Sequence, residues 1–201
     1  MARANGGAVA VAAAVVVLAL SNVACAGLGN GEWAATPPTT PDAPPQPAAP
    51  VVDGSTISGT GYRFTIPAGW QPAANAVVGE GGTVDLTIAG SSVTMGVRPV
   101  IDVMLETGTW KTVADYAAEH RDRLAGQAGI TLQGASRPQT VAGSPAVAME
   151  FTYRHQTRLR ARQVLCLHHG RGYVITLHTY ETASPEDLTA FDQSLGAWSW
   201  T

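Results

Sequence analysis

The chain has 201 residues, which is enough for one ordinary domain with terminal extensions and too few for two full domains. Hydrophobic residues make up 45% and charged residues 13%, which excludes a wholly disordered chain and a long coiled coil. The formal net charge of -3 excludes nucleic acid as the default partner, because neutralising phosphates needs an excess of Lys and Arg.

The first segment has the layout of an export signal. Residues 9–20 form an unbroken run of Ala, Val and Leu that follows Arg3 and precedes small residues. These are the parts of a secretory signal peptide, and the run is shorter than the about 20 apolar residues that span a bilayer. We therefore expect residues 1–25 to be a signal peptide.

Two outcomes are open at the end of this signal. Val23-Ala24-Cys25 resembles a bacterial lipobox, in which the cysteine receives a diacylglycerol thioether, although Asn22 stands where leucine is usual. Cleavage after Ala26 would instead remove Cys25 and release a secreted protein. We favour lipidation of Cys25, which predicts attachment to the outer face of the cell membrane through the acyl chains.

A proline-rich stretch follows the signal. Residues 34–50 have proline every few positions and almost no charge, so they cannot bury a core and should be extended. We assign residues 26–58 to a disordered linker that lifts the domain away from the membrane. Residues 59–201 form one predicted domain, a length that buries about two thirds of the unfolded surface.

Six strands are expected in this domain. Residues 62–66 alternate apolar and polar side chains, and residues 83–89 and 93–100 have strand composition on either side of a Gly-Ser-Ser turn. The second half contains a meander of three further strands, at residues 146–153, 159–167 and 173–180.

Two helices are predicted from their start and stop signals. Thr112 and Asp115 form a capping-box pattern ahead of apolar residues at helical spacing, and Gly126 or Gly129 should end this helix. Ser184, followed by proline and two acids, starts the second helix. The order of strands, helix, strands and helix with short hairpin links predicts an α+β fold, an antiparallel β-sheet packed with two helices. The two terminal tryptophans should complete its core.

The second cysteine is expected to be structural. Cys166 lies inside an apolar strand pattern, which favours a buried small hydrophobe over a reactive thiol. With Cys25 acylated or removed, no disulfide is expected.

The overall layout resembles a known family. The signal with a candidate lipid cysteine, the Pro/Ala/Thr linker and the motif GYRFTIPAGW at residues 61–70 resemble the LpqN/LpqT lipoproteins of mycobacteria and relatives. Two turn motifs, at residues 141–145 and 170–173, fit the same pattern. The resemblance implies a PsbP-like α/β/α sandwich, with the sheet between helices, and it implies no enzyme activity.

Sequence motifs for catalysis or metal binding are not found. There is no G-x-S-x-G, P-loop or C-x-x-C pattern, and the adjacent His168 and His169 would point to opposite faces of a strand. We expect neither an enzyme nor a cofactor or metal site. An unrecognised active site would need a cleft that brings His120, His155 or His178 together with a carboxylate.

One row of charges suggests a binding site. Arg158, Arg160 and Arg162 occupy alternate positions of a predicted strand and should share a face, which His178 of the next strand joins if the register permits. Their guanidinium groups suit phosphate, sulfate or carboxylate, so the row is a candidate contact for an anionic ligand. The alternative, which we favour, is a solvated face balanced by acids on neighbouring strands, Glu150 among them.

Together these observations predict an exported, lipid-anchored envelope protein whose monomeric domain binds an apolar or amphiphilic ligand, such as an envelope lipid, without catalysis. A deep apolar pocket between helix and sheet would support this hypothesis. The alternative is a protein interaction or scaffold module at the cell surface, which an exposed apolar patch beside the arginines would favour.

Overall fold

The computed structural model describes residues 52–53, 56–74, 82–154 and 156–201. The predicted signal peptide, Cys25, the proline-rich stretch and His155 lie outside the described residues.

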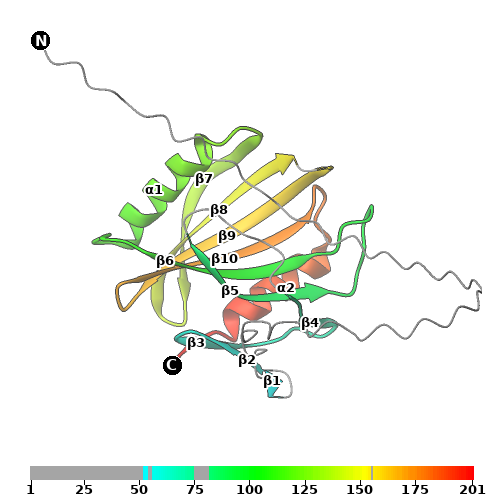
Figure 1. Cartoon of the computed structure of the whole chain (residues 1–201), viewed down its shortest axis with the longest axis horizontal. Helices are drawn as coiled ribbons and strands as arrows, with labels where there is room; N and C mark the ends of the chain where they lie inside the picture. The colour runs from blue at the N-terminus through cyan, green and yellow to red at the C-terminus, as the bar shows by residue number, and fades with distance from the viewer. Residues whose placement is uncertain (1–51, 54–55, 75–81, 155) are drawn as a thin grey trace, which may run out of the picture.

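The described residues form two antiparallel sheets and two helices (Figure 1). The large sheet consists, in spatial order, of β4 (Trp70–Pro72), β5 (Thr83–Gly90), β6 (Val100–Thr107), β10 (Arg171–Tyr180), β9 (Arg158–His168), β8 (Ser144–Arg154) and β7 (Ile130–Val141). The small sheet consists of β1 (Val52–Asp53), β2 (Thr56–Gly59), β3 (Tyr62–Thr65) and β11 (Ser199–Trp200). The helices are α1 (Val113–Ala125) and α2 (Pro185–Gly196).

Helix α1 covers one face of the large sheet, which we call the α1 face. The helix begins with the predicted capping box of Thr112 and Asp115, and Gly126 is its C-cap. Its buried side packs on apolar residues of β8, β9 and β10. Gly172 of β10 permits this close approach, because a Cβ there would lie 2.8 Å from the Tyr116 ring.

Helix α2 and the small sheet cover the opposite face, which we call the α2 face. Ser184 caps α2 by accepting a hydrogen bond from the Asp187 backbone N–H. Aromatic side chains fill the interface: Tyr62 and Phe64 of β3 stack on Trp198, and Phe191 of α2 is fully buried. The terminal tryptophans thus complete the core as predicted, Trp198 within it and Trp200 against its edge.

The helices therefore lie on opposite faces of one antiparallel sheet, and the predicted α+β class is confirmed. The three strands predicted in the second half, β8, β9 and β10, begin and end within two residues of their predicted bounds. Among the described residues, no helix is both long and apolar enough to span a bilayer.

Two local predictions were wrong, and one long strand was not predicted. Residues 93–100 do not form a strand: Gly96 and Pro99 interrupt the run, and the strand is β6, which starts at Val100. Strand β7 was not predicted, because a glycine and a proline interrupt its pattern. Strand β2 starts at Thr56, inside the range assigned to the linker, because its residues pair with β3.

Both outer strands of the large sheet contain proline. Pro72 lies in β4 at one edge and Pro138 in β7 at the other, and both residues are exposed. Strand β7 also has an irregular register between Gln133 and Arg137, where Gly134 has a φ of 65°. These positions explain how proline is accommodated in strands without disturbing a central ladder.

Candidate functional site

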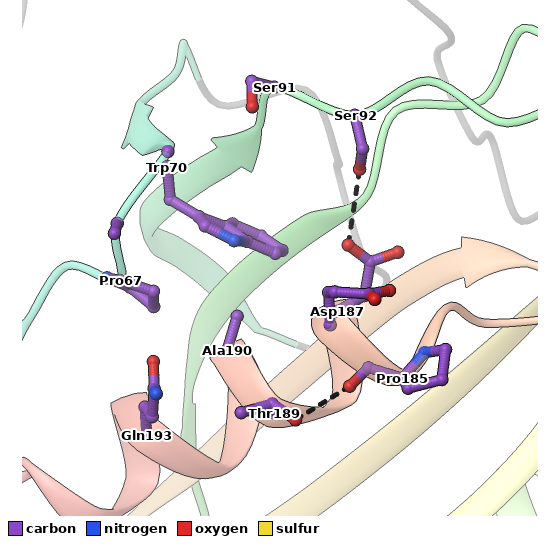
Figure 2. A pocket seen from close by; sticks show the side chains of 12 residues that line it. Pro67, Trp70, Ser91, Ser92, Pro185, Asp187, Thr189, Ala190 and Gln193 are labelled. Atoms are coloured by element: carbon purple, nitrogen blue, oxygen red, sulfur yellow. Dashed lines mark hydrogen bonds between the residues drawn. The ribbon is translucent and has the colours of Figure 1, made fainter.

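A cleft opens between α2, the turn that leads from β3 to Trp70 of β4, and residues 91–92 directly after β5 (Figure 2). Its volume is about 380 Å³. Trp70, Pro67 and Ala190 supply apolar surface, while Ser92 and Gln193 are among its polar residues. The cleft thus combines an aromatic ring with hydroxyl and amide groups, a mixture typical of small-ligand sites.

Local backbone structure places the Trp70 ring at this cleft. Gly69 has a φ of 79°, and the Trp70 N–H donates to the Pro67 carbonyl at 3.1 Å, which turns the chain into β4. Trp70 pairs with Gly90 of β5, where a Cβ would lie 3.2 Å from the indole. The glycine leaves room for the ring to lie across the strand, half-buried.

The N-terminal turn of α2 makes the cleft acidic. Asp187 is buried and accepts a hydrogen bond from the Ser92 hydroxyl at 3.4 Å, while Glu186 is exposed at the rim. The Ser92 hydroxyl therefore donates to a carboxylate in a site whose lining contains no histidine, which does not correspond to an activated nucleophile. Because the charged lining residues are both acids, the cleft suits a neutral or cationic ligand better than an anion.

The predicted arginine row lies on the α2 face, and each arginine contacts a carboxylate. Arg158 pairs with Glu181 at 3.1 Å between Nη1 and Oε1. Arg162 pairs with Asp192 of α2 at 2.9 Å between Nη2 and Oδ1, and its guanidinium lies 5.5 Å from the centre of the Phe191 ring.

The middle arginine shares its acid with another strand. Glu150 of β8 accepts from Arg160 and also from Arg137 of β7, the latter at 3.0 Å. Carboxylates of β8, of α2 and of Glu181, the residue after β10, therefore lie beside the arginine row. The anionic-contact hypothesis remains a prediction, but an anion would have to compete with these pairs.

His178 lies on the other face of the sheet. The register pairs His178 with Ala161 and Thr179 with Arg160, so His178 points away from the arginines. Its Nε2 lies 3.1 Å from Asp102 Oδ1, and its Nδ1 lies 2.8 Å from the Tyr153 hydroxyl. Since a carboxylate accepts, Nε2 donates and Nδ1 accepts from Tyr153, whose pKa is raised by burial and by Asp102.

His120 of α1 belongs to a second polar group on the same face. His120 Nε2 donates to Gln163 Oε1 at 3.0 Å, because an amide oxygen accepts, and His120 Nδ1 lies 2.7 Å from Arg123 Nη2 and 3.7 Å from Glu106 Oε1. Gln163 in turn donates to Thr176 at 3.2 Å. Arg123 also donates to both oxygens of Glu106 at 2.8 Å.

Glu106 is the buried charge of this group. Burial raises the pKa of its carboxyl, but the contacts with His120 and Arg123 outweigh burial, so that the pKa is lowered below its ordinary value of 4.5. His120 and His178 thus both meet a carboxylate, but neither lines the cleft. Within the described ranges, no group of three or more His, Cys, Asp or Glu could hold a metal ion.

Cys166 is fully buried, as predicted, and its burial raises the pKa of the thiol to about 12.

The residues that sequence reasoning missed are Trp70 at the cleft and the buried polar side chains of the α1 face. Asp102, Glu106 and Gln163 stand within apolar strand sequence, and that exception to the pattern was the available signal.

Comparison with solved structures supports the fold. LpqN of Mycobacterium tuberculosis, described as involved in cell envelope biogenesis, is 16% identical, with a TM-score of 0.54 over 76% of this chain and 89% of that chain. Cyanobacterial PsbP (CyanoP) of Synechocystis sp. PCC 6803 is 15% identical, with a TM-score of 0.51 over 75% of this chain and 95% of that chain. The expected likeness to LpqN and PsbP is thus confirmed for the fold.

The sequence itself matches a different family. No curated protein matches it. Residues 57–200, which include both helices and every described strand except β1 and the first residue of β2, match the serine/threonine kinase C-terminal domain family. Because this match spans more than half of the sequence, the chain belongs to the serine/threonine kinase C-terminal domain family.

Proposed function

We propose that this protein is a membrane-attached recognition domain that acts outside the cytoplasm and binds a small neutral or cationic ligand in the cleft beside Trp70, without catalysing a reaction. The observation that carries the proposal is the cleft itself, where a half-buried indole faces hydroxyl, amide and carboxylate groups of α2 and the β5–β6 connection.

The proposed location is supported by the N-terminal sequence and by the fold. Residues 1–25 have the parts of a secretory signal, and Cys25 stands at its end as the candidate anchor. The fold is shared with LpqN, which is involved in cell envelope biogenesis in Mycobacterium tuberculosis. The family name denotes the C-terminal domain of kinases, which is compatible with recognition as the role of this part.

The proposed ligand class follows from the cleft lining. The Trp70 ring offers a flat apolar surface for a sugar ring or a short alkyl group. Gln193, Thr189 and Ser91 offer donors and acceptors for hydroxyl or amide groups, and Glu186 and Asp187 favour a neutral or positively charged group. A saccharide, an amino sugar or the polar head of an uncharged amphiphile fits this chemistry.

The interior offers less support for a fully enclosed lipid. Among the described residues, the interface between α2 and the large sheet is filled by aromatic and aliphatic side chains, with Phe191 and Tyr62 fully buried. An amphiphile is therefore expected to place its polar head in the cleft and to leave its apolar chains outside the α2 interface.

The first experiment is native mass spectrometry of the full chain purified from an actinobacterial host, followed by its denatured mass. A native mass above the denatured mass identifies a retained ligand, and the denatured mass shows whether Cys25 is acylated. The compound found, or otherwise a panel of neutral, cationic and anionic saccharides, is then titrated against Trp70→Ala with Trp110→Ala as the matched control.

We expect Trp70→Ala to weaken binding by about tenfold or more, which corresponds to one aromatic contact, and Trp110→Ala to bind like the wild type. Trp110 is also half-buried, but it packs on Tyr116 of α1, away from the cleft. Equal binding by Trp70→Ala and the wild type would place the ligand elsewhere. Absence of any retained or titratable ligand would favour the alternative role, a protein interaction module.

A further inference from the structure

Five arginine side chains lie together on the α2 face of the large sheet, in the part formed by β7, β8 and β9 (Figure 1). Glu150 of β8 contacts both Arg137 of β7 and Arg160 of β9. Arg154 follows Glu150 at an even spacing on the same strand and therefore shares its face. We call these five residues the arginine patch: Arg137, Arg154, Arg158, Arg160 and Arg162.

The arginine patch has more positive charge than its acids neutralise. Within the described ranges, its ion pairs are with three carboxylates, those of Glu150, Glu181 and Asp192. Arg154 has no acidic partner among the described residues, and the register places it directly opposite Arg158. Like charges directly opposite each other on neighbouring strands repel and destabilise the sheet. Folding alone therefore does not account for arginine at both positions.

The arginine patch becomes more accessible away from α2. The Arg162 side chain, which pairs with Asp192 of α2, is 23% exposed, whereas the side chains of Arg158 and Arg137 are 56% and 72% exposed. Arg154 is exposed as well. Exposed ion pairs contribute little to stability, so an incoming anion can replace them at a small cost in free energy.

Glu150 shows how a carboxylate fits this surface. Its Oε1 accepts from Arg137 Nη2 at 3.0 Å and its Oε2 accepts from Arg160 Nη2, so one carboxylate bridges the guanidinium groups of two strands. Arg154 and Arg158 also lie on two strands, directly opposite each other. A carboxylate from a ligand can bridge them in the same way, with one oxygen accepting from each arginine.

The surroundings of the arginine patch favour an acidic saccharide over an acidic protein. Thr131 and Gln133 are exposed on β7 and present hydroxyl and amide groups on the same face. Among the described residues, the exposed large hydrophobic side chains are Val93 and Met95, which lie in the β5–β6 connection and not in the patch. Protein interfaces centre on apolar and aromatic anchors, whereas sugar hydroxyls need hydrogen-bonding groups.

We propose that the arginine patch binds the carboxylate groups of an acidic polysaccharide, one of which bridges Arg154 and Arg158. The row from Arg158 to Arg162 is about 13 Å long, which matches a short stretch of an extended saccharide chain. The excess of positive charge suits a ligand with several carboxylates. This site is separate from the cleft beside Trp70, whose charged lining residues are acids, and it does not depend on the proposed function.

Isothermal titration calorimetry of the full chain with trigalacturonate at low salt tests the proposal. The fully methyl-esterified trisaccharide, which has no charge, is the ligand control, and a triglutamate peptide with blocked ends carries the same groups on a different backbone. Arg154→Gln removes half of the bridging pair. Arg98→Gln is the matched protein control, because Arg98 is exposed, lies in the β5–β6 connection and loses the same charge.

We expect Arg154→Gln to weaken trigalacturonate binding about tenfold, because it removes a charged hydrogen-bond donor from the site. Arg98→Gln and Trp70→Ala should bind trigalacturonate like the wild type. Binding by the wild type should weaken at about 0.3 M salt, since salt screens exposed charges.

A second pair of variants tests the opposite sign. Glu181→Gln removes the acid that pairs with Arg158 and should strengthen binding about twofold or more. Glu119→Gln makes the same change of charge on α1 and should bind like the wild type. Strengthening by both variants to the same extent would show a general effect of net charge and would overturn the assignment to the arginine patch.

The remaining outcomes are equally decisive. Equal binding by Arg154→Gln and the wild type, or no binding of trigalacturonate at low salt, would overturn the proposal. Equal binding of the methyl ester would show that the carboxylates are not recognised. Tighter binding of the triglutamate peptide than of trigalacturonate would overturn the saccharide assignment in favour of an acidic protein partner.

Discussion

The two faces of the large sheet are covered in different ways. Helix α2 and the small sheet contact their face through stacked aromatic rings and aliphatic side chains. Helix α1 contacts the other face through a smaller apolar cluster and through a polar group in which Arg123 and His120 meet Glu106 and Gln163. Helix α2 is held mainly by apolar burial, with a partly exposed ion pair to Arg162, whereas helix α1 is also held by directional bonds to a buried carboxylate.

This difference separates two kinds of stability in one domain. When a buried apolar side chain is shortened, the free energy of unfolding falls in proportion to the volume removed. This loss depends little on pH. A buried carboxylate with its partners fixes the position of a helix. Its contribution to the free energy of unfolding depends on every partner and on whether the carboxyl is protonated. Mutations on the two faces should therefore differ in size and in pH dependence.

The largest effect is expected on the α2 face. Phe191→Ala removes a fully buried ring that packs with Trp198 and the central strands, and it should lower the free energy of unfolding by about 3–5 kcal/mol. Urea denaturation followed by circular dichroism measures the change. Val93→Ala, at an exposed site, is the control and should stay within about 0.5 kcal/mol of the wild type. A loss below about 1 kcal/mol for Phe191→Ala would contradict the assignment of this ring to the core.

Removing the buried charge on the α1 face should cost less. Glu106→Gln keeps the shape but leaves Arg123 and His120 without their carboxylate, and about 1–3 kcal/mol should be lost because Arg123 is partly exposed. The same denaturation assay applies, with Glu119→Gln as control. Glu119 also approaches Arg123, at 3.6 Å, but is exposed, and its change should be below about 0.5 kcal/mol. Equal losses of unfolding free energy in the two variants would show that the burial of Glu106 does not strengthen its contact with Arg123.

The pH dependence should distinguish the faces further. Because the pKa of Glu106 is lowered in the folded protein, its contribution is complete above the ordinary value of 4.5 and is lost as pH falls through the lowered pKa. The difference in unfolding free energy between the wild type and Glu106→Gln should therefore shrink on acidification, whereas the difference for Phe191→Ala should stay constant. Denaturation at pH 7 and at pH values below 4.5 tests this sign. A growing Glu106→Gln difference would refute it.

The smallest effects are expected in the arginine row. Arg158→Gln breaks an ion pair whose partners are both largely exposed, and its cost should lie between about 0 and 0.5 kcal/mol. Arg162→Gln should cost about 1 kcal/mol, because it also loses the contact with the Phe191 ring. Thermal unfolding at low and high salt measures both. A cost for Arg158→Gln above that for Arg162→Gln would contradict the role assigned to the ring contact.

Elements with strong local signals were predictable from sequence. The capping box of α1, the Ser184 cap of α2 and the alternating runs of β8, β9 and β10 predicted the helices and the meander, because these signals lie within a few residues. The interrupted strand β7 was not predictable in this way. Gly134 and Pro138 are unfavourable in an average strand, and only its place at an edge of the sheet makes them acceptable.

The candidate site was less predictable than the fold. The arginine row was placed on one face from alternation alone, but the position of His178 depended on the register between two strands, which alternation does not determine. Trp70 and Asp187 are far apart in sequence, and the cleft exists only because β4 and α2 meet in the folded domain. Sequence signals of local structure contain no such information.

The prolines at the two sheet edges have a consequence for crowded surfaces. Proteins tethered to one membrane meet each other at high local concentration, and an open sheet edge is a template on which a neighbouring copy can add a strand. Pro72 and Pro138 each remove a backbone donor from an outer strand, at opposite edges of the same sheet. Both prolines therefore disfavour the addition of a strand at the sheet edges wherever copies of the domain are crowded.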